Sequence, residues 1–345
     1  MLDTATPHHH DPFSARLGAH LRDAAGLAPE AVLRQLAAAG LDRLPLPGHG
    51  ATLARWRALA LAGAHDLSLA KLYEGHTDAL AILHEAGAPA PAPGTLWGTW
   101  CAEPPEARLR LLAGPDGAWL LEGRKAWCSG ARDVSHAVVS CWNEAGEAML
   151  AAVELGQDGV VVTDAGWQAL GMRASASVDV DFSGARATPL GGPGFYTRRA
   201  GFWHGGAGVA ACWFGAATTL AEALRRRVVG RDDPHRLVQL GEVTVALQAC
   251  AAQMRETAAA IDRMPNADAM AAALSLRLAV EAAATTTLAA AGRALGPGPM
   301  CKDARMARLF ADLPVFMRQS HAERDLEALG RAVAAGVDER APWSL

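Results

Sequence analysis

The spacing of hydrophobic residues changes twice along this 345-residue chain, and that change limits the possible fold more than any other feature. From about residue 12 to residue 88, apolar side chains recur every three or four positions, which is typical of helices. From Thr95 to about Pro189, short apolar runs alternate with turn residues, and after GGPGF (191–195) the helical spacing returns. We therefore predict an α+β fold with an N-terminal helical domain over 1–94, a central β-domain over 95–190 and a C-terminal four-helix bundle over 191–345.

The central segment carries most of the strand signals. The stretch RLRLLAGPDGAWLLEG places two apolar runs around Gly-Pro-Asp-Gly, which predicts a hairpin, and HAVVSCWNEAGEAMLAAVEL repeats that plan. GVVVT and SVDVDF add further strands, so we expect a small β-sandwich or barrel. The stretch APAPAPG (88–94) ends the helical pattern before it and is typical of a stiff linker.

The last segment is dominated by long, Ala-rich helical stretches such as GVAACWFGAATTLAEALRRRVVG and ADAMAAALSLRLAVEAAATTTLAAAGRAL. Small residues on helix faces permit close packing, which favours a four-helix bundle. Several stretches are apolar almost all round, and such helices are buried on more than one side. We therefore expect a contact between copies of the chain, in a homodimer or homotetramer.

Composition excludes several functional classes. About half of the residues are hydrophobic, a fifth are charged and the formal net charge is −4, so neither nucleic acid nor an anionic membrane is expected as a partner. The six cysteines lack the Cys-x-x-Cys spacing of zinc sites and redox motifs, which favours free thiols in a reducing compartment and no metal site. We find no signal-peptide core and no uncharged stretch long enough for membrane insertion, and we predict a soluble cytoplasmic protein.

Four motifs occur in an informative order. They are WCAEP (100–104), GRKAWCSGA (123–131), ALGMRAS (169–175) and GRDDPHRLVQLGE (230–242). Together they resemble the acyl-CoA dehydrogenase superfamily of flavoproteins, and the resemblance covers about residues 60 to 320. It implies a helical domain, a β-domain and a four-helix bundle that bind FAD. It also implies a small-molecule substrate such as an acyl-CoA, hydride transfer to flavin N5 and a separate electron-acceptor flavoprotein.

The resemblance places four residues of the β-domain at the flavin ring. Cys101 and Ala102 would present backbone groups to the ring, Trp127 would pack on its face or edge, and Ser129 would hydrogen-bond near N5. Ordinary core packing for Trp127 and a turn position for Ser129 are the alternatives. The family usually has a threonine where this chain has Ala102, so one flavin hydrogen bond is missing.

Four more residues would contact the distal half of FAD from a neighbouring subunit. By resemblance, Arg231 reaches the pyrophosphate and Gln239 lies on the helix that follows. Gly296 and Gly298, in ALGPGP, match a glycine-rich turn near the adenine end. A plain loop between helices is the alternative for these two glycines.

The catalytic base of the family has no direct counterpart. In KDARMARLFADL (302–313), the usual glutamate falls on Ala311, and the threonine that helps to hold FAD falls on Leu313. Some members carry the base on the first long helix of the bundle, and the matching position lies near Gly205 in FWHGGAGVA, which holds no carboxylate. Asp312, one residue beyond the usual position, is the candidate catalytic residue. Because Asp312 precedes Leu-Pro and a helical run, we interpret it first as a helix N-cap and second as a base.

Three functions therefore remain open. The first is an FAD-dependent oxidoreductase acting on an acyl-CoA or related substrate, with Asp312, His204 or a substrate group in place of the base. The second is a flavin-dependent monooxygenase of the same superfamily, which needs no such base. The third is a catalytically silent homologue that acts as a binding or assembly subunit. His321 and Asp325, four residues apart, could orient an imidazole, but a surface helical pair is the preferred interpretation.

Overall fold

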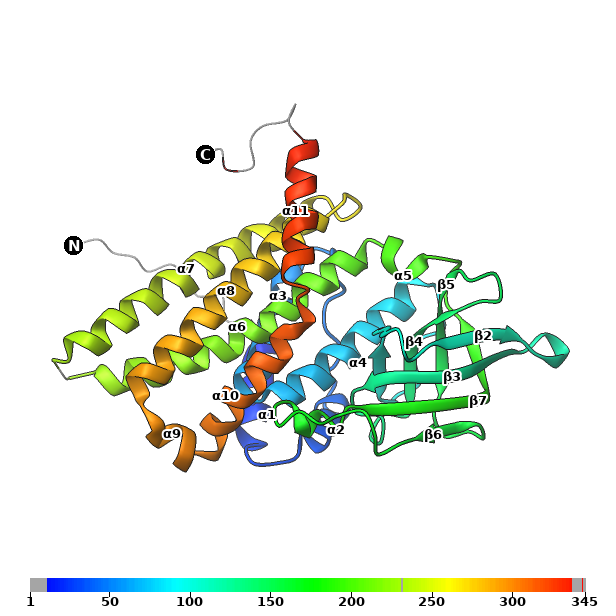
Figure 1. Ribbon diagram of the computed structural model, residues 1–345, viewed down its shortest axis with the longest axis horizontal. Coiled ribbons are helices and arrows are strands. Elements are labelled where there is room, and N and C mark those ends of the chain that lie inside the picture. The colour runs from blue at the N-terminus through cyan, green and yellow to red at the C-terminus, as the bar shows by residue number, and fades with distance from the viewer. Residues whose placement is uncertain (1–10, 231, 337–342, 344–345) are drawn as a thin grey trace.

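A computed structural model describes residues 11–230, 232–336 and 343 of the chain (Figure 1). The first part is helical, as predicted, with α1 (Pro12–Asp23), α2 (Pro29–Ala38), α3 (Thr52–His65) and α4 (Leu67–Glu85). Asp66 alone separates α3 from α4, and its side chain accepts a hydrogen bond from the Leu69 N–H at the start of α4. The carboxylate satisfies a backbone donor that has no partner within the helix. This cap allows α4 to begin one residue after α3 ends.

A small β-barrel follows. Its strands are β1 (Trp97–Trp100), β2 (Leu109–Ala113), β3 (Trp119–Cys128), β4 (His136–Trp142), β5 (Ala148–Glu154), β6 (Val160–Val162) and β7 (Val178–Pro189). The two predicted hairpins are confirmed, because β2 pairs with β3 and β4 with β5 in antiparallel register. Strand β5 also pairs with β7, and β4 with β2, so that β4, β2, β3, β7 and β5 form a closed ring. Closure leaves few free strand edges in this domain.

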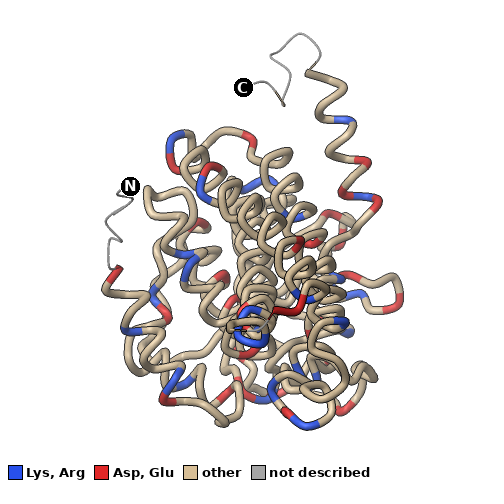
Figure 2. The backbone as a smooth tube through the Cα atoms, turned by 90° about the vertical axis from the view of Figure 1, so that its left-hand side faces the viewer, with Lys and Arg blue, Asp and Glu red and all other residues tan. Residues whose placement is uncertain are grey.

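Helices form the rest of the chain. They are α5 (Phe195–Arg198), α6 (Gly201–Val228), α7 (Pro234–Arg263), α8 (Met270–Leu295), α9 (Pro297–Lys302), α10 (Ala304–Phe316) and α11 (Glu323–Ala335). Figure 1 shows α6, α7 and α8 side by side, with the barrel at the opposite end of the molecule. Helix α6 is apolar and long enough to cross a membrane by composition alone, but 61% of its most apolar window is buried inside the protein, as in a core helix. In Figure 2 basic and acidic residues are interspersed. Helix α11 contacts α8 and projects from the rest of the molecule (Figure 1).

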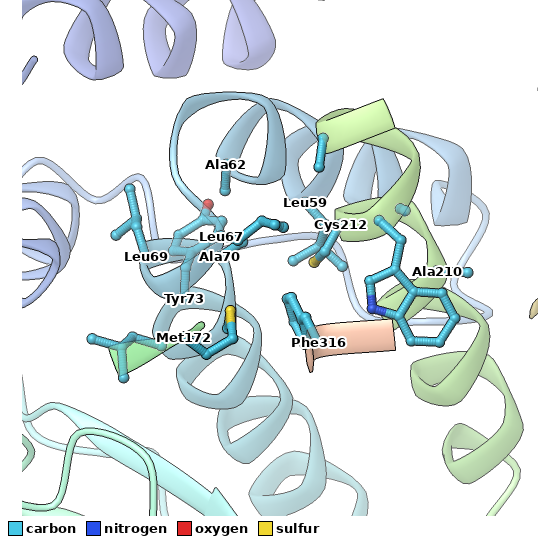
Figure 3. Close-up of a cluster of buried hydrophobic side chains, with 14 of the residues drawn as sticks. Leu59, Ala62, Leu67, Leu69, Ala70, Tyr73, Met172, Ala210, Cys212 and Phe316 are labelled. Carbon is cyan, nitrogen blue, oxygen red and sulfur yellow. The ribbon is translucent and has the colours of Figure 1, made fainter. Parts of the chain in front are cut away.

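Two glycines allow α3 and α6 to pack backbone against backbone. An ideal Cβ at Gly63 would lie 2.1 Å from the Cys212 carbonyl oxygen, and one at Gly215 would lie 1.9 Å from the Ala60 carbonyl oxygen. No side chain fits at either position unless the helices move apart. The contact places α6 directly over the core shown in Figure 3, where Tyr73 and Phe316 point into the same apolar cluster.

The expectation that Asp312 begins a helix is wrong. Helix α10 begins at Ala304, and the N-cap is Asp303, whose carboxylate accepts hydrogen bonds from the N–H groups of Arg305 and Met306. Asp312 lies in the third turn, and Pro314 is accommodated in the last turn. A 3₁₀ turn at Met317–Gln319 follows α10, and α11 starts at Glu323.

Candidate functional site

Trp127 occupies an unusual position where the barrel meets the helices. Its φ angle is +58°, in the left-handed region that bulky residues rarely adopt, and 48% of its surface is exposed. The register of β3 with β7 shifts between Lys125 and Cys128, so a bulge turns Trp127 out of the ladder. An exposed indole held on a strained backbone indicates a functional position more than a packing one.

The turn after ALGMR lies against this bulge. Met172 and Ala176 also have positive φ angles, +58° and +45°. The Gly130 N–H donates to the Ser175 carbonyl at 2.9 Å, and the Ser129 and Ser177 hydroxyl oxygens are 2.8 Å apart. Three of the four described non-glycine residues with positive φ therefore lie in the two segments that meet here, and the Ser129 hydroxyl belongs to a chain of serines.

Asp312 holds this turn in place. Its Oδ1 accepts a hydrogen bond from the Met172 N–H, and an ideal Cβ at Gly171 would lie 2.1 Å from the Ala311 carbonyl oxygen. Burial raises the pKa of the Asp312 carboxyl group, while the hydrogen bond from Met172 acts in the opposite direction. Asp312 thus connects α10 to the barrel. Met172 points from this turn into the core between α4 and α10 (Figure 3).

Side-chain contacts connect the first two flavin motifs. The Trp100 indole N–H donates to the Ser129 carbonyl at 3.0 Å, which brings Cys101 and Ala102 close to the Trp127 bulge. Inside the barrel Lys125 is 1% exposed and donates to the Ser140 carbonyl oxygen at 2.8 Å. Its ammonium also lies 3.4 Å from Glu103. The residues predicted from the β-domain are therefore gathered on one side of the barrel.

The other predicted flavin residues lie at the end of the molecule opposite the barrel (Figure 1). Gln239 is on α7, Gly296 ends α8 with a φ of +67°, and Gly298 is in α9. Arg236 Nε donates to the Ala294 carbonyl at 2.9 Å and joins the start of α7 to the end of α8. Arg231 lies outside the described residues. A single chain does not bring these residues to the barrel.

Sequence reasoning missed a buried cluster of charged side chains between α4 and α6. Arg199 Nη1 lies 2.9 Å from Glu85 Oε2, and its Nη2 lies 3.8 Å from Asp78 Oδ2. The Gly201 N–H donates to Glu85 Oε1 at 3.0 Å, and the guanidinium group lies 5.3 Å from the centre of the Tyr196 ring. The signal was present in DALAILHE, because carboxylates seven residues apart lie on one face of a helix.

Cys101 connects this cluster to the flavin motifs. Burial raises the pKa of its thiol to about 11, with Lys125 opposing the shift and Tyr196 and Asp78 among the nearby groups. Burial likewise raises the pKa of Tyr196 well above its ordinary value, and the nearby Cys101 and Asp78 act in the same direction. Both side chains are therefore neutral around pH 7, and the Cys101 thiol is a poor nucleophile.

The histidines near the site differ in their contacts. His76 is buried, with Nδ1 accepting from the Trp97 N–H at 3.1 Å and Nε2 lying 3.2 Å from Asp42. His204 lies on α6, where burial lowers its pKa. His321 precedes α11, and its backbone N–H donates to Asp325 at 3.1 Å, so the pair closes the start of that helix. Among the described residues, no three His, Cys, Asp or Glu side chains are grouped so as to hold a metal ion.

No protein-family model and no curated protein sequence matches the chain. A solved structure of KijD3, with FMN and dTDP-3-amino-2,3,6-trideoxy-4-keto-3-methyl-D-glucose, aligns with a TM-score of 0.80 at 21% identity over 96% of this chain and 94% of KijD3. TdsC from Paenibacillus sp. A11-2, with FMN and indole, aligns with a TM-score of 0.80 at 19% identity over 96% of this chain and 97% of TdsC. The methanesulfinate monooxygenase MsuC from Pseudomonas fluorescens aligns with a TM-score of 0.77 at 20% identity over 96% of this chain and 97% of MsuC.

The chain has the acyl-CoA dehydrogenase-like fold. The structures that share it are flavin-dependent enzymes, and TdsC is a dibenzothiophene monooxygenase. The expectation of FAD is wrong, because the KijD3 and TdsC structures contain FMN. FMN ends at one phosphate and has no adenine. The resemblance to FAD enzymes therefore gave Gly296 and Gly298 a place near an adenine that FMN lacks. It likewise gave Arg231 a contact with a pyrophosphate that FMN lacks.

Proposed function

We propose that the chain is an FMN-dependent monooxygenase acting on a small-molecule substrate. The observation that carries the proposal is the hydrogen bond from the Met172 N–H to Asp312. Asp312 is the carboxylate next to the family's usual base position, and this bond engages it with the backbone. Proton removal from an acyl thioester depends on such a base, whereas oxygen transfer from reduced flavin does not. The fold shared with KijD3, TdsC and MsuC supports the same choice.

The residues of the barrel side fit a flavin. Trp127 offers a flat apolar face that is 48% exposed, and the Ser129 hydroxyl adds a polar group beside it. The Lys125–Glu103 contact joins the loop after β1 to β3, and the Asp312–Met172 hydrogen bond holds the turn that lies against the Trp127 bulge. Trp127, Ser129 and the backbone of Cys101 and Ala102 would bind and orient the ring. A pre-formed arrangement of this kind binds with less loss of conformational freedom.

The overall reaction balances with two co-substrates. When bound, reduced FMN supplies two electrons and two protons, so that one atom of O₂ enters the substrate and the other leaves as water. Electrons then flow into this enzyme from a reductant. We accordingly propose an electron donor as its redox partner, in place of the electron acceptor that a dehydrogenase would need.

The test begins with flavin binding. Purified protein is titrated with FMN or FAD, oxidised and anaerobically reduced, and quenching of tryptophan and flavin emission gives the dissociation constants. We expect FMN to bind and Trp127→Ala to weaken its binding about tenfold or more, because base- or ring-stacking contacts contribute roughly 1–3 kcal/mol. Trp119→Ala is the matched control, since Trp119 lies on the same strand and is 38% exposed.

Either of two results would overturn the proposal. One is a folded protein that binds neither oxidised nor reduced FMN, which favours the binding or assembly subunit. The other is FMN affinity that is unchanged in Trp127→Ala. With flavin bound, oxygen uptake that depends on reduced FMN and on substrate distinguishes a monooxygenase from a dehydrogenase, whose flavin is bleached anaerobically by its substrate.

The acyl-CoA oxidoreductase remains as a second candidate because of Asp78. Its Oδ1 lies 3.0 Å from where a Cβ at Gly205 would be, and the alternative position of the family base lies near Gly205. A carboxylate from α4 therefore lies beside the place where other members carry one on α6. Anaerobic bleaching of bound flavin by acyl-CoAs, lost in Asp78→Asn, would favour this function.

A further inference from the structure

A cavity of about 210 Å³, called the α4 cavity below, lies between α4, the loop that follows α2 and the proline-rich linker. Its lining residues on α4 are Thr77, Leu80, Ala81, Leu83 and His84. All of these except Leu83 recur at i, i+3, i+4 and i+7, so they share one face of the helix. None of the predicted flavin residues that the structure describes is among the lining residues, so the α4 cavity is separate from the candidate flavin site.

The loop side of the α4 cavity is held in place by side chains of α4. Asp42 lines the cavity, and its Oδ2 lies 3.2 Å from Nε2 of the buried His76. One residue earlier in the loop, the Leu41 carbonyl oxygen accepts a hydrogen bond from the buried Tyr73 hydroxyl. The loop is thus fixed to the helix and does not close over the space between them.

The linker side is fixed as well. The chain turns back after α4 at Gly87, which has a φ of +68°, and the Ala88 N–H donates to the Leu83 carbonyl oxygen at 2.9 Å. Pro89 and Pro91 also line the cavity, and their rings restrict the linker to few conformations. Both walls are therefore pre-formed, and a ligand binds to such walls with less loss of conformational freedom.

The lining offers apolar surface and little net charge. Apart from the residues of α4, it includes Leu44 and Leu46 of the loop and the two prolines, which have no N–H to donate. Asp42 is 5% exposed, and its charge is opposed by Arg43, whose Nε lies 3.6 Å from Asp42 Oδ2. The Thr77 hydroxyl donates to the Glu74 carbonyl oxygen at 3.2 Å. An ion would therefore lose its hydration here without gaining a matched partner.

We propose that the α4 cavity is a binding site for a small uncharged apolar molecule, such as one with a single aromatic ring. The volume suits a molecule of this size, since an apolar cavity of about 150 Å³ in another protein binds benzene. The mostly apolar, concave lining with a few polar groups at its edge is typical of small-molecule sites. The site does not depend on the proposed function, because it shares no residue with the flavin site.

The test titrates the full-length protein with toluene, benzoate and benzylammonium, three probes of similar size that differ in charge. Ligand-observed NMR gives each dissociation constant. We expect toluene to bind about tenfold more tightly than either ion, or better, because moving an unpaired charge from water into an apolar site is unfavourable. Toluene should also raise the midpoint of thermal unfolding in a concentration-dependent way, because it binds the folded state.

Two variants fill the cavity from different walls. Ala81→Leu adds a branched side chain from α4, and Ala90→Leu adds one from the linker, where Ala90 is exposed and a larger side chain leaves the core intact. Each should weaken toluene binding about tenfold or more, because the added atoms occupy the space of the ligand. Ala38→Leu is the matched control, since Ala38 is exposed on α2 and does not line the cavity. Trp127→Ala should leave toluene binding within about twofold, because Trp127 belongs to the separate flavin site.

Unchanged toluene affinity in the filling variants would overturn the inference, and Ala90→Leu alone decides if Ala81→Leu does not fold. Tighter binding of either ion than of toluene would also overturn it. Loss of toluene binding in Trp127→Ala, with binding retained in Ala90→Leu, would place the molecule in the flavin site and refute the α4 cavity. Loss in the filling variants alone would confirm it, whether or not the protein binds FMN.

Discussion

Asp312 joins helix α10 to the turn beside the candidate flavin site through a single hydrogen bond. Its partner, the Met172 N–H, lies 140 residues away in sequence, on the turn that meets the Trp127 bulge. Without the carboxylate, a buried backbone donor would lose its acceptor and the turn would be free to move. The residue therefore acts on the candidate flavin site from outside it.

We expect Asp312→Ala to lower the free energy of unfolding by about 1–3 kcal/mol, because it leaves the buried Met172 N–H unpaired. Asp312→Asn keeps an oxygen at the same place and should be at least as stable as the wild type. Urea unfolding at neutral pH provides the comparison. Equal stability of the alanine and asparagine variants would show that the hydrogen bond is not what matters.

The same pair predicts a pH dependence. Burial raises the pKa of Asp312 in the folded state above the ordinary value of about 3.9, so folding favours the protonated carboxyl group. This contribution is fully present below the unfolded pKa and is lost as pH rises through the folded pKa. The wild type should therefore lose stability relative to Asp312→Asn as the pH rises above about 4, the ordinary pKa of an aspartate.

At the residue scale, the motifs predicted which segments lie close together better than they predicted what each side chain does. WCAEP and GRKAWCSGA do meet in space, through Trp100 and Ser129. The role of Asp312 was mistaken because Asp before Leu-Pro is also a helix-start signal, and only tertiary structure reveals which N–H it accepts from. Asp78 was missed because it lies in an apolar helical run with no motif around it.

At the scale of elements, local pairings were predictable and non-local ones were not. Both hairpins follow from turns within single stretches of sequence. Closure of the barrel depends on β5 meeting β7 and on β2 lying parallel to β4, and no local pattern encodes these pairings. The contact between α3 and α6 also escaped prediction, because a helical glycine reveals neither its partner nor its distance.

Gly215→Ala tests that contact. The added methyl group would lie 1.9 Å from the Ala60 carbonyl oxygen, so α3 and α6 must separate, and overpacking of this kind typically costs about 1–3 kcal/mol. Gly206→Ala, on the same helix, meets nothing within 4 Å and should gain up to about 1 kcal/mol in stability. Thermal unfolding of the two variants should move in opposite directions, and a shift in the same direction would contradict the close packing.

At the scale of the whole molecule, the predicted flavin residues are divided between the barrel and the far end of the bundle. A second copy could bring its own bundle end to the barrel of the first, which is the arrangement that the sequence resemblance implies. Helix α7 offers a surface for such a contact, because Val238 and Val245 are 71% and 72% exposed on one face, seven residues apart. Exposed apolar side chains in a row along a helix are typical of a protein interface.

We therefore expect the wild type to sediment as a dimer or tetramer at micromolar concentration, and the double variant Val238→Asp/Val245→Asp to sediment as a monomer. Charged groups in an apolar interface lose hydration without gaining partners, which opposes association. Val161→Asp is the control, since Val161 is 59% exposed on β6, away from α7. If the flavin site is shared between copies, the monomeric variant must also bind FMN more weakly at unchanged thermal stability. A monomeric wild type that binds FMN fully would place the whole site within one chain and leave Gln239 and the α8–α9 turn without a role in it.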